Sequence, residues 1–138
     1  MNIAKDYPRS YILGADTIVV LDNKILGKPK DRDHGISMLK SLSGKTHEVL
    51  TGISIIQIDS GVDFSFNTST YVSIRTLTNS DICNYIEIYS PYDKAGSYGI
   101  QDGFSKYVKK IDGCFYNVMG LPISEFYKHF LEIRKKDN

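Results

Sequence analysis

Asp16 is the residue of this sequence whose type and position most clearly suggest chemistry. It lies within a nearly continuous apolar and β-branched run at residues 12–21, a pattern typical of a strand buried on both faces. Gly14 and Ala15 precede it, and two small residues let a ligand or another backbone approach closely. A carboxylate in such surroundings has to be paired, bound to a metal or shifted in pKa, because an uncompensated buried charge is costly. The alternative is that Asp16 only caps a neighbouring loop.

Composition limits the classes of protein to which the chain can belong. Its 138 residues suffice for one domain with a hydrophobic core, and its 41% hydrophobic and 24% charged residues are ordinary globular values. A net charge of +1 gives no overall field that would attract nucleic acid or an acidic membrane, so phosphate binding would be local. Cys83 and Cys114 have neither zinc-site nor disulfide spacing. No apolar run is long enough to span a bilayer or form a signal peptide, so we expect a cytoplasmic protein.

The elements that must position Asp16 follow from hydrophobic periodicity and turn residues. The patterns predict, in order, a strand at 11–21, a short return strand at 24–27, a helix at 31–42, a long hairpin at 46–59 and 62–77, a helix capped by Thr78, a loop at 90–101, a strand at 106–111 and a final helix after Pro122. Strands and helices mix without strict alternation. The sequence therefore predicts an α/β or α+β fold with a mixed sheet and flanking helices.

Several blocks of the sequence occur in the order seen in one known family. They are GADT at residues 14–17, VVL at 19–21, ILGKP at 25–29, LSGKTHEVLTG at 42–52, DKAGSYGIQ at 93–101 and NVMGLP at 117–122. In these blocks the chain resembles the Maf-like, or septum-formation, family of nucleoside triphosphate pyrophosphatases. The ordered set spans most of the chain and is far more specific than any single block.

The resemblance implies a nucleotide-binding fold related to the house-cleaning inosine triphosphate pyrophosphatases. Such proteins hydrolyse a nucleoside triphosphate to the monophosphate and pyrophosphate with a divalent metal, Mg²⁺ or Mn²⁺, and many form homodimers. The block at residues 93–101 is similar to that of the subgroup acting on dTTP and UTP. The expected partners are therefore a nucleoside triphosphate and a second copy of the chain, with no nucleic acid and no membrane.

The resemblance also implies roles for individual residues. Asp16 matches the family's proton acceptor, and its carboxylate can accept the proton of the attacking water or hold the metal. Thr17 and Gln101 match positions tied to substrate choice, and the Gln101 amide offers a donor and an acceptor suited to the imide edge of thymine or uracil. Lys28 matches a lysine needed for activity, and Lys94 is a weaker candidate for triphosphate contact. The alternative for Lys28 is a solvated lysine in a turn, and the alternative for Gln101 is hydrogen bonding within its own loop.

Further residues of these blocks are expected to support the site. Gly96 and Gly99 could leave backbone N–H groups free to face phosphate, although glycines in a loop are usually there for the turn. His47, alone in a strand, is expected to be structural, and Asn117 is expected to satisfy backbone groups near the site.

One part of the family pattern is not found in this sequence. The family opens with a strand, a loop of Ser-x-Ser-Pro-Arg-Arg type and an acidic residue before the GADT block, and Pro8-Arg9-Ser10 is not that motif. We therefore expect residues 1–138 to form a single Maf-like domain that is incomplete at the N-terminus and exposes a sheet edge or face. A truncated gene model, an internal start at Met1 and a degenerate protein are the three competing explanations.

Two functions of different classes follow from the sequence. The first is a metal-dependent pyrophosphatase on dTTP, UTP or related non-standard nucleotides. The second is a non-catalytic domain that binds a nucleotide or a partner and has lost the triphosphate clamp. The balanced charge and the absence of a basic, aromatic stripe argue against a nucleic-acid module.

Overall fold

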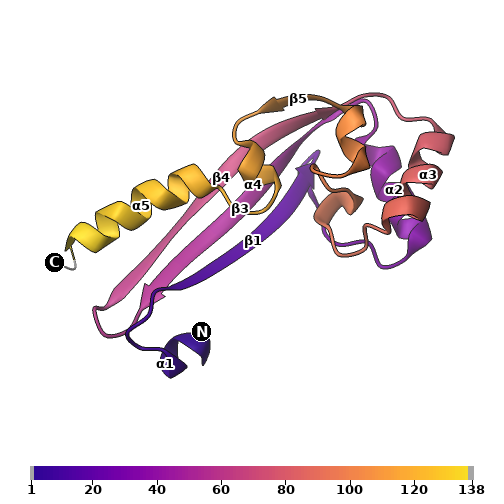
Figure 1. Ribbon diagram of the computed structural model, residues 1–138. Coiled ribbons are helices and arrows are strands. Elements are labelled where there is room, and N and C mark those ends of the chain that lie inside the picture. The colour runs from indigo at the N-terminus through magenta and orange to yellow at the C-terminus, as the bar shows by residue number, and fades with distance from the viewer. Residues whose placement is uncertain (1, 137–138) are drawn as a thin grey trace.

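A single twisted sheet forms the long axis of the molecule. The structure is a computed structural model that describes residues 2–136. Five strands are hydrogen-bonded in the order β2-β1-β3-β4-β5 (Figure 1). They are β1 (Ile12–Leu21), β2 (Lys24–Leu26), β3 (Thr46–Gln57), β4 (Val62–Ile74) and β5 (Val108–Asp112).

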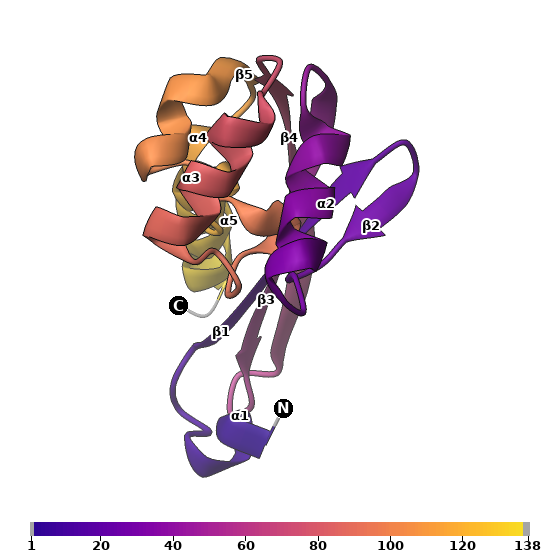
Figure 2. The same cartoon turned by 90° about the vertical axis from the view of Figure 1, so that its right-hand side faces the viewer.

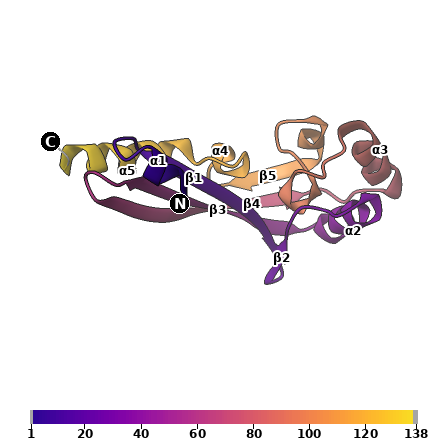
Figure 3. The ribbon, with the colours of Figure 1, turned by 90° about the horizontal axis from the view of Figure 1, so that it is seen from below.

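Helices gather at the two ends of this sheet. They are α1 (Asn2–Asp6), α2 (Arg32–Leu42), α3 (Asn79–Tyr89), α4 (Phe115–Val118) and α5 (Ile123–Lys136), with 3-10 turns η1 (Ala95–Ser97) and η2 (Gly103–Tyr107). Figure 2 shows α2 and α3 side by side over one end of the sheet, where the two helices contact each other. Figure 3, seen from below, shows α4 and α5 along one side of the strands. No helix in residues 2–136 combines the length and apolar composition needed to cross a membrane.

The predicted fold class is confirmed, with one correction to the sheet. All four strand pairings are antiparallel, whereas a mixed sheet was expected. The helix α2 does connect two strands that run in the same direction, β2 and β3, but β1 lies between them and pairs with both. The connection through α2 therefore joins two strands that run parallel, as expected for a mixed sheet. Because β1 lies between β2 and β3, these two strands are not neighbours, and every hydrogen-bonded pair is antiparallel.

Side-chain alternation divides the sheet into a covered face and an open face. In β3, residues 47, 49, 51, 53 and 55 are buried, as period-two alternation requires. The larger core packs beneath α2 and α3 and includes Val49, Val72, Leu39, Ile86 and Phe104; the smaller core, with Ile53, Ile55 and Ile133, packs beneath α5. The covered face thus changes from one core to the other along β3, and residue 51 lies between them.

The expectation that β1 is buried on both faces is wrong. Val19 and Leu21 are buried in the larger core, but Gly14, Ala15 and Asp16 are exposed and Ile18 and Val20 are only partly buried. The even-numbered side chains of β1 point to the opposite face of the sheet, and none of them is fully buried. The apolar run in the sequence reflects one buried face at the end of β1 and an open apolar face along the rest.

Local sequence signals place the two helices beside the sheet accurately. Asp31 caps α2 by accepting a hydrogen bond from the His34 backbone N–H. Thr78 and Asp81 form the predicted capping box of α3, and the same hydrogen bonds hold the pKa of Asp81 below its ordinary value. Gly35 lets the later loop approach α2, because a Cβ there would lie 3.0 Å from Ser97 Oγ.

Candidate functional site

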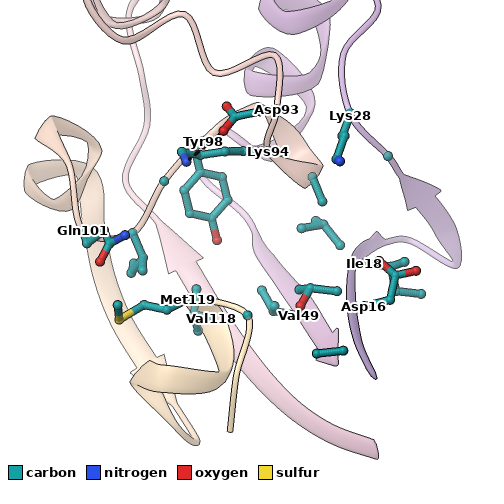
Figure 4. A pocket seen from close by; sticks show the side chains of 18 residues that line it. Asp16, Ile18, Lys28, Val49, Asp93, Lys94, Tyr98, Gln101, Val118 and Met119 are labelled. Atoms are coloured by element: carbon teal, nitrogen blue, oxygen red, sulfur yellow. Dashed lines mark ion pairs between the residues drawn. The ribbon is translucent and has the colours of Figure 1, made fainter. Parts of the chain in front are cut away.

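A cavity of about 480 Å³ opens between the sheet, the segment after β2 and the loop before η2 (Figure 4). Its lining includes all five residues singled out from the sequence: Asp16, Thr17, Lys28, Lys94 and Gln101. These residues come from β1, from the connection between β2 and α2, and from the loop at 93–101. Three segments far apart in the sequence therefore meet around one space of a size that suits a small-molecule ligand.

Asp16 reaches the cavity from the free edge of β1. Only residues 19–21 of β1 pair with β2, so the earlier part of the strand pairs with β3 alone. Figure 4 shows the Asp16 carboxylate at this edge, opposite Gln101 across the cavity. Asp16 also borders a more open hollow with Gly14 and Gly52 on the sheet. The carboxylate is exposed and makes no hydrogen bond or ion pair with another side chain of residues 2–136, which leaves it available to a ligand or water.

Thr17 points to the opposite face from Asp16, as successive strand residues do. Its Oγ1 lies 2.9 Å from Thr51 Oγ1, at the place where the two cores meet. A Cβ on Gly120 would lie 3.5 Å from the same oxygen. Thr17 therefore joins β1 to β3 and lies beside Gly120, which also lines the cavity.

Two lysines supply positive charge to one end of the cavity. Figure 4 shows Lys28 and Lys94 on the same side, with Asp16 and Gln101 at the other two corners. Lys94 Nζ lies 3.5 Å from the exposed Asp93 carboxylate, and its aliphatic stem packs over Gly99. Lys28 forms no ion pair with any residue between 2 and 136. Two ammonium groups at one end of a cavity can bind phosphate as point charges.

The glycines of the 93–101 loop have a different role from the one considered above. The Gly96 N–H donates to Gly27 O at 3.1 Å, and the Gly99 N–H donates to Tyr85 Oη at 2.9 Å. Both donors are thus used within the protein and do not face phosphate, which favours the alternative that these glycines serve the loop itself. These glycines instead fasten the loop to the end of β2 and to α3.

An aromatic and carboxylate network extends this anchoring. Tyr85 Oη donates to Asp102 Oδ2 at 2.9 Å, and Asp102 Oδ1 accepts from the Phe104 N–H at 2.9 Å. Burial is the main cause that raises the pKa of Tyr85 above its ordinary value, so the phenol stays protonated and can donate. Gln101, next to Asp102, is held at the rim while its own side chain stays exposed.

Gly96→Ala should destabilise the protein and displace the loop. Gly96 has φ +72°, and an added Cβ would lie 3.1 Å from Val19 Cγ2. We expect a loss of about 1–2 kcal/mol in the free energy of unfolding from the left-handed backbone alone. Urea unfolding followed by circular dichroism measures it. Gly27→Ala is the matched control, because no atom lies within 4 Å of a Cβ there and its φ is not positive; equal losses in both variants would contradict the prediction.

His47 and Tyr98 form a buried pair behind the cavity. His47 is 1% exposed and its Nε2 lies 2.6 Å from Tyr98 Oη, while Tyr98 lines the cavity. Burial lowers the pKa of His47 from 6.5 to about 4 and raises the pKa of Tyr98. Both side chains are neutral near pH 7, which agrees with the structural role expected for His47.

Acid should destabilise the protein through His47. Its pKa is lower in the folded state, so the unfolded chain binds more protons between pH 6.5 and 4. This contribution to stability is complete above pH 6.5, and about 3 kcal/mol should be lost as the pH falls to 4. Urea unfolding at pH 7, 5.5 and 4 should show a weaker pH dependence for His47→Gln than for wild type. The partly buried His34, changed to glutamine, serves as control; an unchanged slope in His47→Gln would refute the assignment.

Asn117 anchors the residues that follow it, 118–120, which line the cavity. Its side-chain amide donates to Val49 O, Thr68 O and Thr70 Oγ1 at 3.0–3.2 Å, and its backbone oxygen accepts from Thr51 Oγ1. It is fully buried. The expectation that Asn117 satisfies backbone groups is confirmed, and its bonds fix the next residues, 118–120, as a wall of the cavity.

The protein ligands that a divalent metal would find here are few. Among residues 2–136, no group of three or more His, Cys, Asp or Glu side chains is arranged to hold a metal. Mg²⁺, however, binds through one or two carboxylates together with substrate phosphates and water. The exposed carboxylate of Asp16 fits that mode as a single protein ligand.

Sequence comparison now identifies the family. A family model described as Maf-like protein matches residues 1–133. The chain belongs to the Maf-like family. Because the match covers nearly the whole chain, the Maf-like resemblance expected from the separate blocks is confirmed.

Similar proteins carry names that bear on the cavity. A protein of Chlorobaculum tepidum named dTTP/UTP pyrophosphatase is 49% identical over 127 residues, which cover 91% of this chain and 64% of that protein. A protein of the same name from Carboxydothermus hydrogenoformans is 41% identical over 131 residues, covering 95% and 70%. A third, from Bacillus pumilus, is 49% identical over 118 residues, covering 86% and 61%. This Maf-like chain thus spans roughly two thirds of the length of these relatives.

Several lining residues were not predicted individually. They are Ile18, Val49, Asp93, Tyr98, Val118, Met119 and Gly120. Tyr98, Met119 and Gly120 lie inside the Maf-like blocks at 93–101 and 117–122, so their membership in a motif was a usable signal. Val49 lies in the block at 42–52, but its burial gave no reason to place it at the cavity rather than in the core.

Proposed function

We propose that this Maf-like chain carries the nucleotide site of a nucleoside triphosphate pyrophosphatase that acts on dTTP and UTP. The observation that carries the proposal is the meeting of a free carboxylate, two lysines and a glutamine amide around one cavity. The names of the relatives, dTTP/UTP pyrophosphatase, support the same substrate class.

The arrangement suits an anionic ligand with a polar base. The triphosphate would lie at the end that carries Lys28 and Lys94, where positive charge neutralises the phosphate oxygens. The base would lie toward Gln101, whose amide can pair with the N–H and a carbonyl of an imide. The wall between them includes Val49, Val118 and Met119, which exclude water from the ligand.

The chemistry is the attack of water on the α-phosphorus. A new P–O bond forms to the water oxygen, and the bond to the β-phosphate oxygen breaks, which releases pyrophosphate. Asp16 accepts the proton that the water loses, as a general base. The lysines oppose the negative charge that develops on the phosphate oxygens. A bound divalent metal, held by Asp16 and the phosphates, would supply further charge neutralisation.

A substrate panel tests the proposal. The full chain is incubated with dTTP, UTP, CTP or GTP in the presence of Mg²⁺ or Mn²⁺, and released pyrophosphate is measured. Release from dTTP and UTP that exceeds release from CTP and GTP supports the assignment, whereas no release from any nucleotide refutes it. Sedimentation of the same sample tests the homodimer implied by the family.

A second function keeps the cavity but not the turnover. The chain matches only about two thirds of each relative, and Asp16 is the one carboxylate placed at the free edge of β1. Binding of UTP detected by calorimetry, with no pyrophosphate released, would favour a non-catalytic nucleotide-binding domain.

A further inference from the structure

Tyr98 occupies a central position in the cavity that the proposed reaction does not use. Its ring is stacked on Phe104, with centroids 4.6 Å apart, and meets the edge of His47 at 5.4 Å. Only 6% of the residue is exposed. Figure 4 shows the ring projecting into the cavity, with its hydroxyl directed away from Lys94 and toward the middle. The ring is thus fixed from behind while its polar end faces the ligand space.

The hydrogen bond to His47 determines which way the tyrosine proton points. Nε2 of His47 lies 2.6 Å from Tyr98 Oη, and either atom can be the donor. If the tyrosine donates, Nδ1 of the neutral ring must carry the proton. Nδ1, however, is buried without a hydrogen-bond partner in the described part of the chain.

An orphaned buried N–H is rarer in proteins than an unpaired acceptor, so the arrangement favours the proton on Nε2. His47 then donates to the tyrosine oxygen, and Nδ1 is left as a hydrogen-bond acceptor without a donor in the described part of the chain. The hydroxyl hydrogen of Tyr98 is not needed for this contact. It is available to an acceptor in the cavity.

We propose that Tyr98 is a specificity-determining residue, oriented by His47, that donates its hydroxyl hydrogen to a carbonyl oxygen of the bound pyrimidine. This inference rests on the proposed function, because it assumes a nucleotide in the cavity. His47 is a positioning residue, since it acts only through Tyr98.

The surroundings of the hydroxyl favour the base over the phosphates as the acceptor. The hydroxyl points away from the ammonium group of Lys94, whereas Val49 and Val118 line the same part of the cavity. A donor in an apolar wall discriminates strongly, because a ligand without an acceptor leaves that donor unpaired. Thymine and uracil each present two carbonyl oxygens, so Gln101 and Tyr98 can contact opposite parts of one ring.

Tyr98→Phe tests the inference by removing the hydroxyl and keeping the ring. Calorimetry of the full chain should give a Kd for UTP about 5- to 10-fold higher in the variant, the value of one neutral hydrogen bond. Wild type should bind 2-thio-UTP or 4-thio-UTP more weakly than UTP, since sulfur is the poorer acceptor. Tyr98→Phe should lose that discrimination for the same analogue. Tyr107→Phe is the matched control, because Tyr107 Oη lies 3.1 Å from Asp81 and outside the cavity lining.

Each result supports or overturns the inference. An unchanged Kd in Tyr98→Phe overturns it while the proposed function stands, and a wild-type chain that binds no nucleotide overturns both. Nitrogen NMR of the histidine rings, with His47→Gln to assign the signal, gives an independent readout. A proton on Nε2 of His47 is expected, and a proton on Nδ1 would refute the proposed orientation.

Discussion

Asp16→Asn should reduce pyrophosphate release from UTP by about 10²- to 10⁴-fold, the usual contribution of a positioned general base. Asparagine has nearly the same shape, but its amide cannot accept the proton of the attacking water. Asp16 is exposed and has no side-chain partner in residues 2–136, so the variant should fold with unchanged stability. The loss should therefore appear in kcat, measured with saturating UTP.

A matched control separates this effect from a general loss of charge. Asp63 is another exposed carboxylate of the sheet and lies outside the cavity lining. Asp63→Asn should retain wild-type turnover. Calorimetry should show that Asp16→Asn still binds UTP, since the lysines and Gln101 are unchanged. Equal turnover in Asp16→Asn and wild type would remove Asp16 from the mechanism.

Asn117→Ala should cause the largest loss of stability. The substitution removes three hydrogen bonds to Val49 O, Thr68 O and Thr70 Oγ1, and leaves a cavity between the two cores. We expect the free energy of unfolding, measured with urea, to fall by about 3–5 kcal/mol from unpaired buried groups and lost packing. The wall formed by residues 118–120 should shift with it, so any chain that still folds should bind UTP more weakly.

Two further variants keep this prediction testable if Asn117→Ala does not fold. Thr70→Val removes one acceptor of the Asn117 amide together with the hydrogen bonds between Thr70 Oγ1 and the Cys114 backbone, and should cost about 1–3 kcal/mol. Asn67→Ala changes an exposed asparagine on the same strand and should leave stability nearly unchanged. A loss in Asn67→Ala as large as that in Asn117→Ala would show that the network is not the cause.

Sequence patterns gave most of the secondary structure because the signals involved are local. The N-cap Asp31, the capping box of Thr78 and the hairpin between β3 and β4 each depend on residues only a few positions apart. The strand ends were less accurate: β4 ends at Ile74 instead of continuing to residue 77, and β5 begins at Val108. The residues at which a strand begins and ends depend on its pairing partners, which hydrophobic periodicity does not reveal.

The individual site residues were named from motifs, but their surroundings were not. The expectation that the strand around Asp16 is buried on both faces was wrong, because an apolar run does not tell whether a second layer covers it. For the N–H groups of Gly96 and Gly99 the sequence left phosphate contact and a turn role open, and the structure shows them donating to Gly27 and Tyr85, which lie in other segments.

The sequence by itself determined the family, the order of helices and strands and the set of polar side chains that could bind a nucleotide, because each follows from nearby residues or from intact motifs. Only the tertiary structure decided that Asp16 lies at a free strand edge, that His47 holds Tyr98 across 51 positions of the chain, and that Asn117 joins β3 to β4. These arrangements depend on how distant segments pack, and burial and hydrogen-bond partners exist only after that packing has formed.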